Sequence, residues 1–266
     1  MADWDPQLYH RFRRYRAEPF EAILARLELG SEERIVDLGC GTGEHLAELV
    51  RRTARGTGVG VDSSPAMIAA AKELLLTLDG GLAARLRFVL EDLRSFQARR
   101  AYSLVFSNAA LQWTQDHRPV LEACYQALEF GGRLVMQIPA NEIETAQRSM
   151  LALASSDRWH AQLSGARLPG LYVLPLEDYR RMLAEIGFVD IDCYYRNFEH
   201  PMASPGEVIE WSRATSMRPF LDALEPDDRA RFEADLLTEL ERGYGSRGPL
   251  IFTFRRLFLW AHRPAL

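Results

Sequence analysis

Hydrophobic positions follow two different spacings along the chain. Between residues 6 and 29 apolar side chains stand mostly three or four residues apart, which predicts an amphipathic helix that ends at Gly30. Further on, short apolar runs alternate with segments of helical spacing, and a helix near residues 117–129 leads through Gly131-Gly132 into the fifth run. The five runs lie near residues 35–38, 58–62, 86–90, 102–106 and 134–138. This alternation predicts a doubly wound, mostly parallel α/β sheet.

The pattern is less regular after residue 138. A helix is expected at 176–186, a strand near 188–197, helices through most of 204–243, and a final strand within 250–260. The sheet would then have seven strands and two helical insertions, which would cover the crevice where open α/β sheets bind ligands. We expect an N-terminal helical cap (1–30), a core (31–138), a lid insertion (139–175), a return to the sheet (176–199), a helical lid (200–248) and a last core strand (249–266).

Composition narrows the class of protein. The 266 residues include 32 Lys and Arg against 37 Asp and Glu, a net charge of −5 that argues against nucleic acid as a partner. Cys40, Cys124 and Cys193 are far apart and lack ligand spacing, so we expect reduced thiols and no metal. No apolar run of 18 residues occurs. We therefore expect a cytoplasmic, monomeric protein with no membrane partner.

Three glycines follow the first predicted strand, at Gly39, Gly41 and Gly43. Glycines allow the backbone to approach a ligand closely and to adopt turn angles that other residues avoid. This spacing is weak by itself, but here it lies at the first strand-to-helix turn, and Asp62 ends the next strand. A carboxylate at that point can accept both hydroxyl groups of an adenosine ribose. The pattern therefore indicates a nucleoside site.

The helix that follows this loop argues against a dinucleotide. Glu44 stands where the dinucleotide fingerprint has its third glycine, and its carboxylate would repel a pyrophosphate at the helix N-terminus. An NAD(P)-dependent oxidoreductase is therefore disfavoured but stays open. At the next strand ends, Asp92 could accept the adenine amino group, Leu93 could supply a backbone N–H, and Asn108 could hold an amino acid moiety. Together these positions favour a nucleoside that carries an amino acid.

Two resemblances follow from these residues. Val36–Gly43, with Asp62, Glu91-Asp92 and Asn108 in order, resembles the S-adenosylmethionine-binding core of class I methyltransferases, a Rossmann-like fold, over about residues 34–138. Further motifs are Trp4-Asp5-Pro6, Asp62–Ile68, Leu111–His117, Gln137-Ile138-Pro139, Trp211–Pro219 and Arg256-Leu257-Phe258. With these motifs, nearly the whole chain resembles the trans-aconitate 2-methyltransferases, which form a monomethyl ester on a small tricarboxylate.

The resemblance implies a cofactor and a set of residues that hold it. The cofactor would be S-adenosyl-L-methionine and the product S-adenosyl-L-homocysteine. Tyr9 and Arg16 map onto an N-terminal segment that closes over the methionine end, and an aromatic ring such as that of Trp113 suits a sulfonium. The predicted cofactor-binding residues are Tyr9, Arg16, Asp37, Gly39, Cys40, Gly41, Asp62, Ser63, Met67, Asp92, Leu93, Asn108 and Trp113.

Methylation of a carboxylic acid needs no catalytic base, because the acid is already ionised at pH 7. A small polycarboxylate does require local cations, and the arginine fork matches a carboxylate. Five arginines lie in the lid and last strand, at 196, 213, 218, 247 and 256, and Arg218 falls in a matched motif. The predicted substrate-binding residues are Arg196, His200, Trp211, Arg218 and Arg247.

Alternatives remain at this stage. Glu199 stands where the family has a tyrosine, which puts the identity of the acid in doubt. A methyltransferase acting on a hydroxyl, amine or carbon would need a base, for which His200 is the candidate. A binding protein that keeps the cofactor but lacks turnover also fits. His117 is expected to be exposed or to cap the helix that follows it.

Overall fold

The computed structural model describes residues 6–164, 172–213, 216–246 and 248–266, with all their side chains except those of residues 6–11 and 13. The chain forms two compact units. The core unit comprises Phe20–Ile138, Tyr172–Arg196 and Leu257–Leu266. The helical unit comprises Met1–Pro19, Pro139–Leu171 and Asn197–Arg256.

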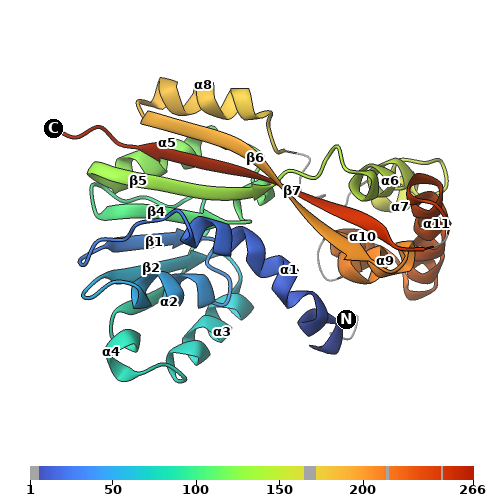
Figure 1. Ribbon diagram of the computed structural model, residues 1–266, viewed down its shortest axis with the longest axis horizontal. Coiled ribbons are helices and arrows are strands. Elements are labelled where there is room, and N and C mark those ends of the chain that lie inside the picture. Colours follow the sequence, from blue (N-terminus) through green and yellow to red (C-terminus); the bar gives the residue numbers. More distant parts are fainter. Residues whose placement is uncertain (1–5, 165–171, 214–215, 247) are drawn as a thin grey trace. The chain divides into compact units, whose positions relative to one another are not determined.

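A seven-stranded sheet organises the fold (Figure 1). Its order is β3-β2-β1-β4-β5-β7-β6. The strands are β1 (Arg34–Leu38), β2 (Thr57–Asp62), β3 (Leu86–Leu90), β4 (Tyr102–Asn108), β5 (Leu128–Pro139), β6 (Val189–Met202) and β7 (Leu250–His262). The pairings from β3 through to β5 are parallel. This confirms the predicted mostly parallel sheet.

The last strand runs antiparallel to β5. Backbone hydrogen bonds join Arg263 to Gly131 and Gly132, and Ala140 to Arg255, so residue numbers rise along one strand as they fall along the other. Gly131 has φ 74° and lies where the register between β4 and β5 shifts. The glycine pair, expected between a helix and the fifth run, is therefore an irregularity within β5, which already begins at Leu128.

The helices of the core unit follow the predicted pattern closely. They are the end of α1 (Pro6–Leu24), α2 (Glu44–Arg51), α3 (Pro65–Leu75), α4 (Gly80–Ala83), the 3₁₀ turn η1 (Leu111–Trp113), α5 (Arg118–Ala127) and α8 (Leu176–Ile186). α3 begins with Ser64 as its cap and Pro65 in its first turn, and α8 ends at Gly187, which has φ 109°. α1 ends five residues before the predicted boundary at residue 29.

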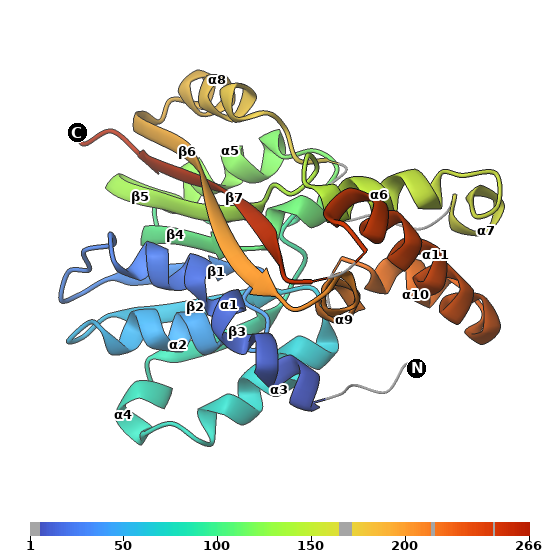
Figure 2. The ribbon, with the colours of Figure 1, turned by 45° about the vertical axis from the view of Figure 1, so that its right-hand side comes forward.

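The helical unit has its own apolar centre. It contains α6 (Thr145–Ala154), α7 (His160–Leu163), α9 (Pro205–Arg213), α10 (Arg218–Ala223) and α11 (Pro226–Tyr244) (Figure 2). α11 packs against α6 and α9. The rings of Trp159 and Phe220 pack on Phe232, and the indole N–H of Trp159 donates to Asp235 at 2.9 Å. None of the helices in the described ranges is long and apolar enough to cross a membrane.

Candidate functional site

The glycine loop between β1 and α2 is built for close approach. Gly39 and Gly41 have φ values of 78° and 54°, in the left-handed region that favours glycine. A Cβ at Gly39 would stand 2.2 Å from the Cβ of Ala110, whereas a Cβ at Gly41 would meet nothing within 4 Å. Gly39 is thus required by packing against the segment after β4, and Gly41 borders open space.

Asp62 fixes this loop from the end of β2. Its Oδ2 accepts the backbone N–H of Gly41 and its Oδ1 accepts that of Ser64, both at 2.9 Å. Each carboxylate oxygen has a second lone pair. The half-buried carboxylate is therefore held in one orientation with one acceptor position left on each oxygen, the arrangement that suits two adjacent hydroxyl groups.

Asp37 is a buried carboxyl with an orphaned oxygen. It is 1% exposed, and its Oδ1 has no hydrogen-bond partner. Burial, and then the nearby charge of Asp62, raise the pKa of Asp37 to about 8. A cationic ligand group would relieve both effects. Asp37 is thus suited to the ammonium group of an amino acid.

A second orphaned acceptor lies on the neighbouring strand. The Oδ1 of Asn108, at the end of β4, is buried without a partner, while its Nδ2 lies 3.4 Å from Nδ1 of His45. Phe20 stacks on the His45 ring at 4.1 Å, and burial lowers the pKa of His45 to about 4. The imidazole is therefore neutral at pH 7 and adds no positive charge. β1 and β4 are paired strands, so both orphaned oxygens belong to the same edge of the sheet.

The remaining predicted cofactor residues differ in their exposure and in the contacts that they already make. Met67 and Trp113 are 41% and 54% exposed, large apolar groups in contact with solvent. Ser63 is exposed and Leu93 half-buried. The carboxylate of Asp92 is bound by the guanidinium of Arg94 at 2.6 Å, so an adenine amino group would share it. Burial raises the pKa of the Cys40 thiol, which leaves Cys40 as a packing residue of the loop rather than a nucleophile.

In the helical unit, His200 is buried within aromatic rings. Tyr15 stacks on it at 4.2 Å, Trp211 lies at 5.7 Å and Phe254 at 6.2 Å. Its Nδ1 is 3.9 Å from a carboxylate oxygen of Glu18, and its Nε2 has no partner. Burial, and then the cation of Arg256, lower the pKa of His200 to about 4. The ring is neutral at pH 7 and a weak base.

Arg16 and Trp211 are brought together. Arg16 donates to the backbone carbonyl of Trp211 at 3.4 Å, and its guanidinium lies 5.1 Å from the centre of the Trp211 ring. Trp211 is 1% exposed and also packs edge-on against Phe12 at 5.2 Å. These two predicted residues form part of one cluster around His200.

The predicted arginines are placed differently. Arg218 is exposed on α10 beside Asp222, at 3.5 Å, and Arg196 is exposed on β6. Arg247 and the side chain of Tyr9 lie outside the described residues. Glu199 is exposed, whereas its neighbours Phe198 and His200 are buried, so its carboxylate lies on the opposite face of β6 from the His200 cluster.

Arg256, which lies outside the predicted substrate set, is a buried arginine of the helical unit. Arg256 is 6% exposed, and its guanidinium carbon lies 3.4 Å from the centre of the Phe254 ring. Its sequence signal is the alternation in β7, where Phe252, Phe254 and Arg256 fall on the buried positions and Arg255 does not. In a pair of adjacent strand arginines, one must share the face of the apolar residues.

The expectation for His117 was wrong. Its side chain is 2% exposed and makes no capping hydrogen bond at the start of α5. Nδ1 lies 2.7 Å from the hydroxyl of Tyr179 and Nε2 lies 3.2 Å from the carbonyl of Thr114. His117 is a core residue with both ring nitrogens paired, because α8 covers it, and that contact cannot be read from its neighbours in sequence.

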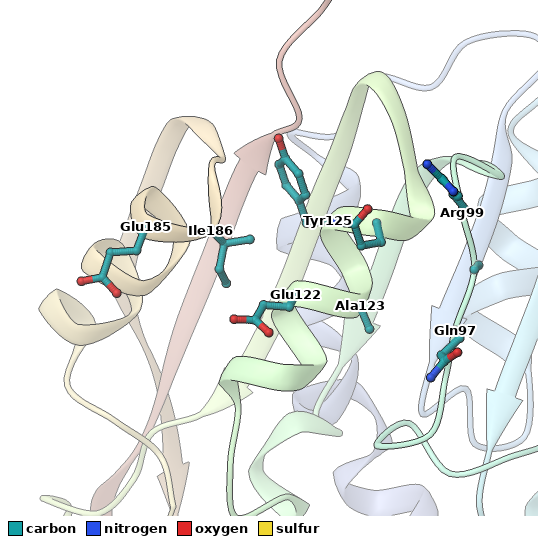
Figure 3. A pocket seen from close by; sticks show the side chains of 9 residues that line it. Gln97, Arg99, Glu122, Ala123, Tyr125, Glu185 and Ile186 are labelled. Atoms are coloured by element: carbon teal, nitrogen blue, oxygen red, sulfur yellow. The ribbon is translucent and has the colours of Figure 1, made fainter.

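A cavity of about 650 Å³ lies elsewhere in the core unit, between the ends of α5 and α8 and the segment before β4 (Figure 3). Its walls carry charges of both signs. They include Gln97, Arg99, Glu122, Tyr125, Glu185 and Ile186. These residues stand near the start of β4, whereas the glycine loop and Asn108 belong to the carboxyl ends of the strands, so the cavity contains none of the predicted site residues.

Known proteins share this fold. A protein-family model described as a methyltransferase domain matches residues 36–134. The YcgJ protein of Bacillus subtilis aligns with a TM-score of 0.65 at 14% identity, over 94% of this chain and 99% of that one. Phosphoethanolamine N-methyltransferase 2 of Haemonchus contortus, solved in complex with S-adenosyl-L-methionine, gives a TM-score of 0.59 at 18% identity, over 93% of this chain and 52% of that one. The strand order and these alignments show that the chain has the fold of class I methyltransferases.

Closer relatives extend over the full length. The trans-aconitate 2-methyltransferase of Variovorax paradoxus (strain S110) is 34% identical over 100% of both chains, and that of Methylobacterium radiotolerans is 35% identical over 99% of both. The chain belongs to the trans-aconitate 2-methyltransferase family.

Proposed function

We propose that this enzyme transfers a methyl group from S-adenosyl-L-methionine to a carboxylate of trans-aconitate, giving a monomethyl ester and S-adenosyl-L-homocysteine. The observation that carries the proposal is the similarity of 34% to 35% over the whole length of relatives with that name. Because it extends through the helical unit, it includes the segments where acceptor residues were expected and not the cofactor core alone.

The residues of the core unit fit the cofactor. Asp62 would accept hydrogen bonds from the two ribose hydroxyls, and the unpartnered oxygens of Asp37 and Asn108 would accept hydrogen bonds from the ammonium group. The exposed side chains of Met67 and Trp113 would cover the adenine and the sulfonium. When bound, the cofactor supplies an electrophilic methyl group on sulfur, which a carboxylate oxygen can take without a proton transfer.

The chain's own work is then positioning and exclusion of water. The acceptor oxygen must be held within about 3–3.5 Å of the carbon it attacks, in line with the breaking bond. No side chain has to remove a proton from an ionised acid. The lowered pKa of His200, about 4, agrees with this role, since such a histidine is poorly suited to act as the base that a hydroxyl or amine acceptor would need.

The test is a methyl-transfer assay that follows S-adenosyl-L-homocysteine formation. Acceptors are trans-aconitate, related di- and tricarboxylates, and a set of phenols. Turnover on a polycarboxylate, with the ester identified by mass spectrometry, supports the proposal. Turnover on phenols alone would assign the enzyme to another acceptor class. Binding of the cofactor without turnover on any acceptor would make the chain a binding protein.

We also infer that the enzyme works as a cytoplasmic monomer. The acidic net charge of −5 and three buried thiols, Cys40, Cys124 and Cys193, support this. Sedimentation of the purified protein and fractionation of the cells that produce it are the measurements, and a stable dimer or a membrane-bound fraction would contradict the inference.

A further inference from the structure

Arg256 is a buried cation without a counter-ion. Its Nε and Nη1 atoms are buried and lack a hydrogen-bond partner, and within the described part of the chain no carboxylate pairs with it. Burial lowers the pKa of Arg256 well below its ordinary value, yet a guanidinium is not deprotonated in proteins at neutral pH, so the buried group keeps its charge. Its contact with the Phe254 ring, 3.4 Å from the ring centre, orients it but supplies no hydrogen bond.

Several other arginines of the helical unit behave differently. They are exposed or half-buried and bind carboxylates of the same unit. These pairs include Arg158 with Asp235, Arg213 with Glu233, Arg218 with Asp222, Arg231 with Asp228, and Arg242 with Glu239. A buried charge left unpaired lowers the free energy of unfolding, so a fold gains nothing from keeping it unless an anion binds there.

His200 adds a second unpartnered polar atom beside this cation. Arg256 and His200 both pack against the ring of Phe254, and the electrostatic effect of Arg256 reaches the imidazole. The ring is 1% exposed, and its Nε2 is buried without a partner. A neutral imidazole carries one N–H, and in the tautomer with the proton on Nε2 this group can donate to an anion. Tyr15 of α1 and Trp211 of α9 pack against the imidazole and hold it in place.

We propose that Arg256 and His200 form the carboxylate-binding site for the acceptor. This rests on the proposed function and narrows it: a carboxylate of the acceptor acid binds the unpartnered N–H groups of Arg256 and the Nε2 of His200.

The chain offers a matched control for the main test. Arg255 is the adjacent residue of β7, has the same side chain, and lies on the opposite, less buried face. We compare Arg256→Met, Arg256→Lys, His200→Phe and Arg255→Met. Measurements are calorimetric affinities for trans-aconitate in the presence of S-adenosyl-L-homocysteine, affinities for S-adenosyl-L-homocysteine alone, kcat and KM, and melting temperatures.

The expected pattern separates binding from structure. Arg256→Met weakens trans-aconitate binding by about 30-fold or more. It leaves the affinity for S-adenosyl-L-homocysteine unchanged, and it keeps or raises the melting temperature because a buried unpaired charge has been removed. Arg256→Lys has an intermediate affinity for trans-aconitate, because lysine keeps the positive charge but lacks the planar guanidinium. His200→Phe weakens binding by about tenfold, and Arg255→Met matches wild type.

Two results with these variants would overturn the site. In one, Arg256→Met keeps the wild-type KM and affinity for trans-aconitate while the wild-type enzyme forms the ester, so the proposed function stands without this site. In the other, Arg256→Met and Arg256→Lys both have lower melting temperatures and bind the cofactor and the acceptor more weakly, which indicates a structural role.

If the wild type forms no ester yet binds polycarboxylates through Arg256, the site stands and the proposed function falls. If the wild type neither binds nor esterifies any polycarboxylate, both fall.

Discussion

At the scale of single residues, two of the buried acceptors without a partner in the core unit carry the most information. Asp37 and Asn108 each have an oxygen without a partner, which is uncommon for buried polar atoms in a folded chain. Such atoms are retained where a ligand completes their hydrogen bonds. Their chemistry therefore suits a cationic group at the ends of β1 and β4.

Asp37→Asn should stabilise the ligand-free enzyme near neutral pH. The pKa of Asp37 is about 8 in the fold against 3.8 ordinarily, so between about pH 4 and pH 8 the folded state holds a proton that the unfolded state has lost. Wild-type stability therefore falls as pH rises through this range. The variant lacks this dependence, and its melting temperature should exceed that of wild type by a few degrees at pH 7.5, where 1 kcal/mol corresponds to about 2–4 °C.

The same variant should bind S-adenosyl-L-homocysteine about tenfold more weakly, because a charged partner of the ammonium is lost. Melting curves from pH 5 to pH 8 and calorimetric titrations measure the two effects. A constant difference in melting temperature across this pH range would show that Asp37 titrates normally in the fold.

Gly39→Ala and Gly41→Ala should differ sharply. At Gly39 the new methyl group would lie 2.2 Å from the Cβ of Ala110, and the alanine would have to keep the left-handed φ of 78°. We therefore expect a loss of about 3 kcal/mol or more in the free energy of unfolding. At Gly41 only the left-handed backbone is strained, which costs about 1–2 kcal/mol. Urea unfolding measures both, and equal losses would mean that contact with Ala110 does not decide the choice of glycine.

At the scale of elements, the alternation of strand side chains decides which lid residues face the His200 cluster. β6 buries Phe198, His200 and Met202 and exposes Glu199 and Pro201. The departure from the family at Glu199 therefore falls on the solvent side of the strand. The sequence places Glu199 next to His200, but in the fold its side chain lies on the opposite face of β6.

Glu199→Gln should accordingly leave the KM for the acceptor within about twofold of wild type, since exposed charges in water at ordinary salt have weak effects. Steady-state kinetics with trans-aconitate provide the measurement. A decrease in KM of tenfold would show that the carboxylate opposes acceptor binding after all.

At the scale of the whole molecule, the cofactor preference is the property that separates the open alternatives. A ligand at 100 times its Kd stabilises the folded state by about 2.7 kcal/mol, provided that it does not bind the unfolded chain. S-adenosyl-L-methionine and S-adenosyl-L-homocysteine should therefore raise the melting temperature by several degrees. NAD and NADP should not, because Glu44 opens α2 where a pyrophosphate would have to bind. A comparable rise with NAD would return the oxidoreductase interpretation to consideration.

Much of the core could be predicted because its signals are local. The spacing of apolar residues predicted each strand of the parallel sheet to within a few residues, and the turn at Gly39 to Gly43 follows from neighbouring positions. β5 was the exception, since its first half contains two glycines that only the pairing with Arg263 makes part of a strand. The boundary of α1 was also missed.

The sequence by itself determined the class of enzyme, because the glycine loop and the strand-end polar residues lie within one stretch of the chain whose order is fixed by the fold. Tertiary structure alone decided which charges are buried and which are paired. Asp37 owes its raised pKa to burial and to Asp62, and His117 owes its burial to α8. The alternation of β7 places Arg256 on the apolar face, but that Arg218 has a carboxylate beside it and Arg256 has none among the described residues depends on residues far apart along the chain, which local spacing does not record.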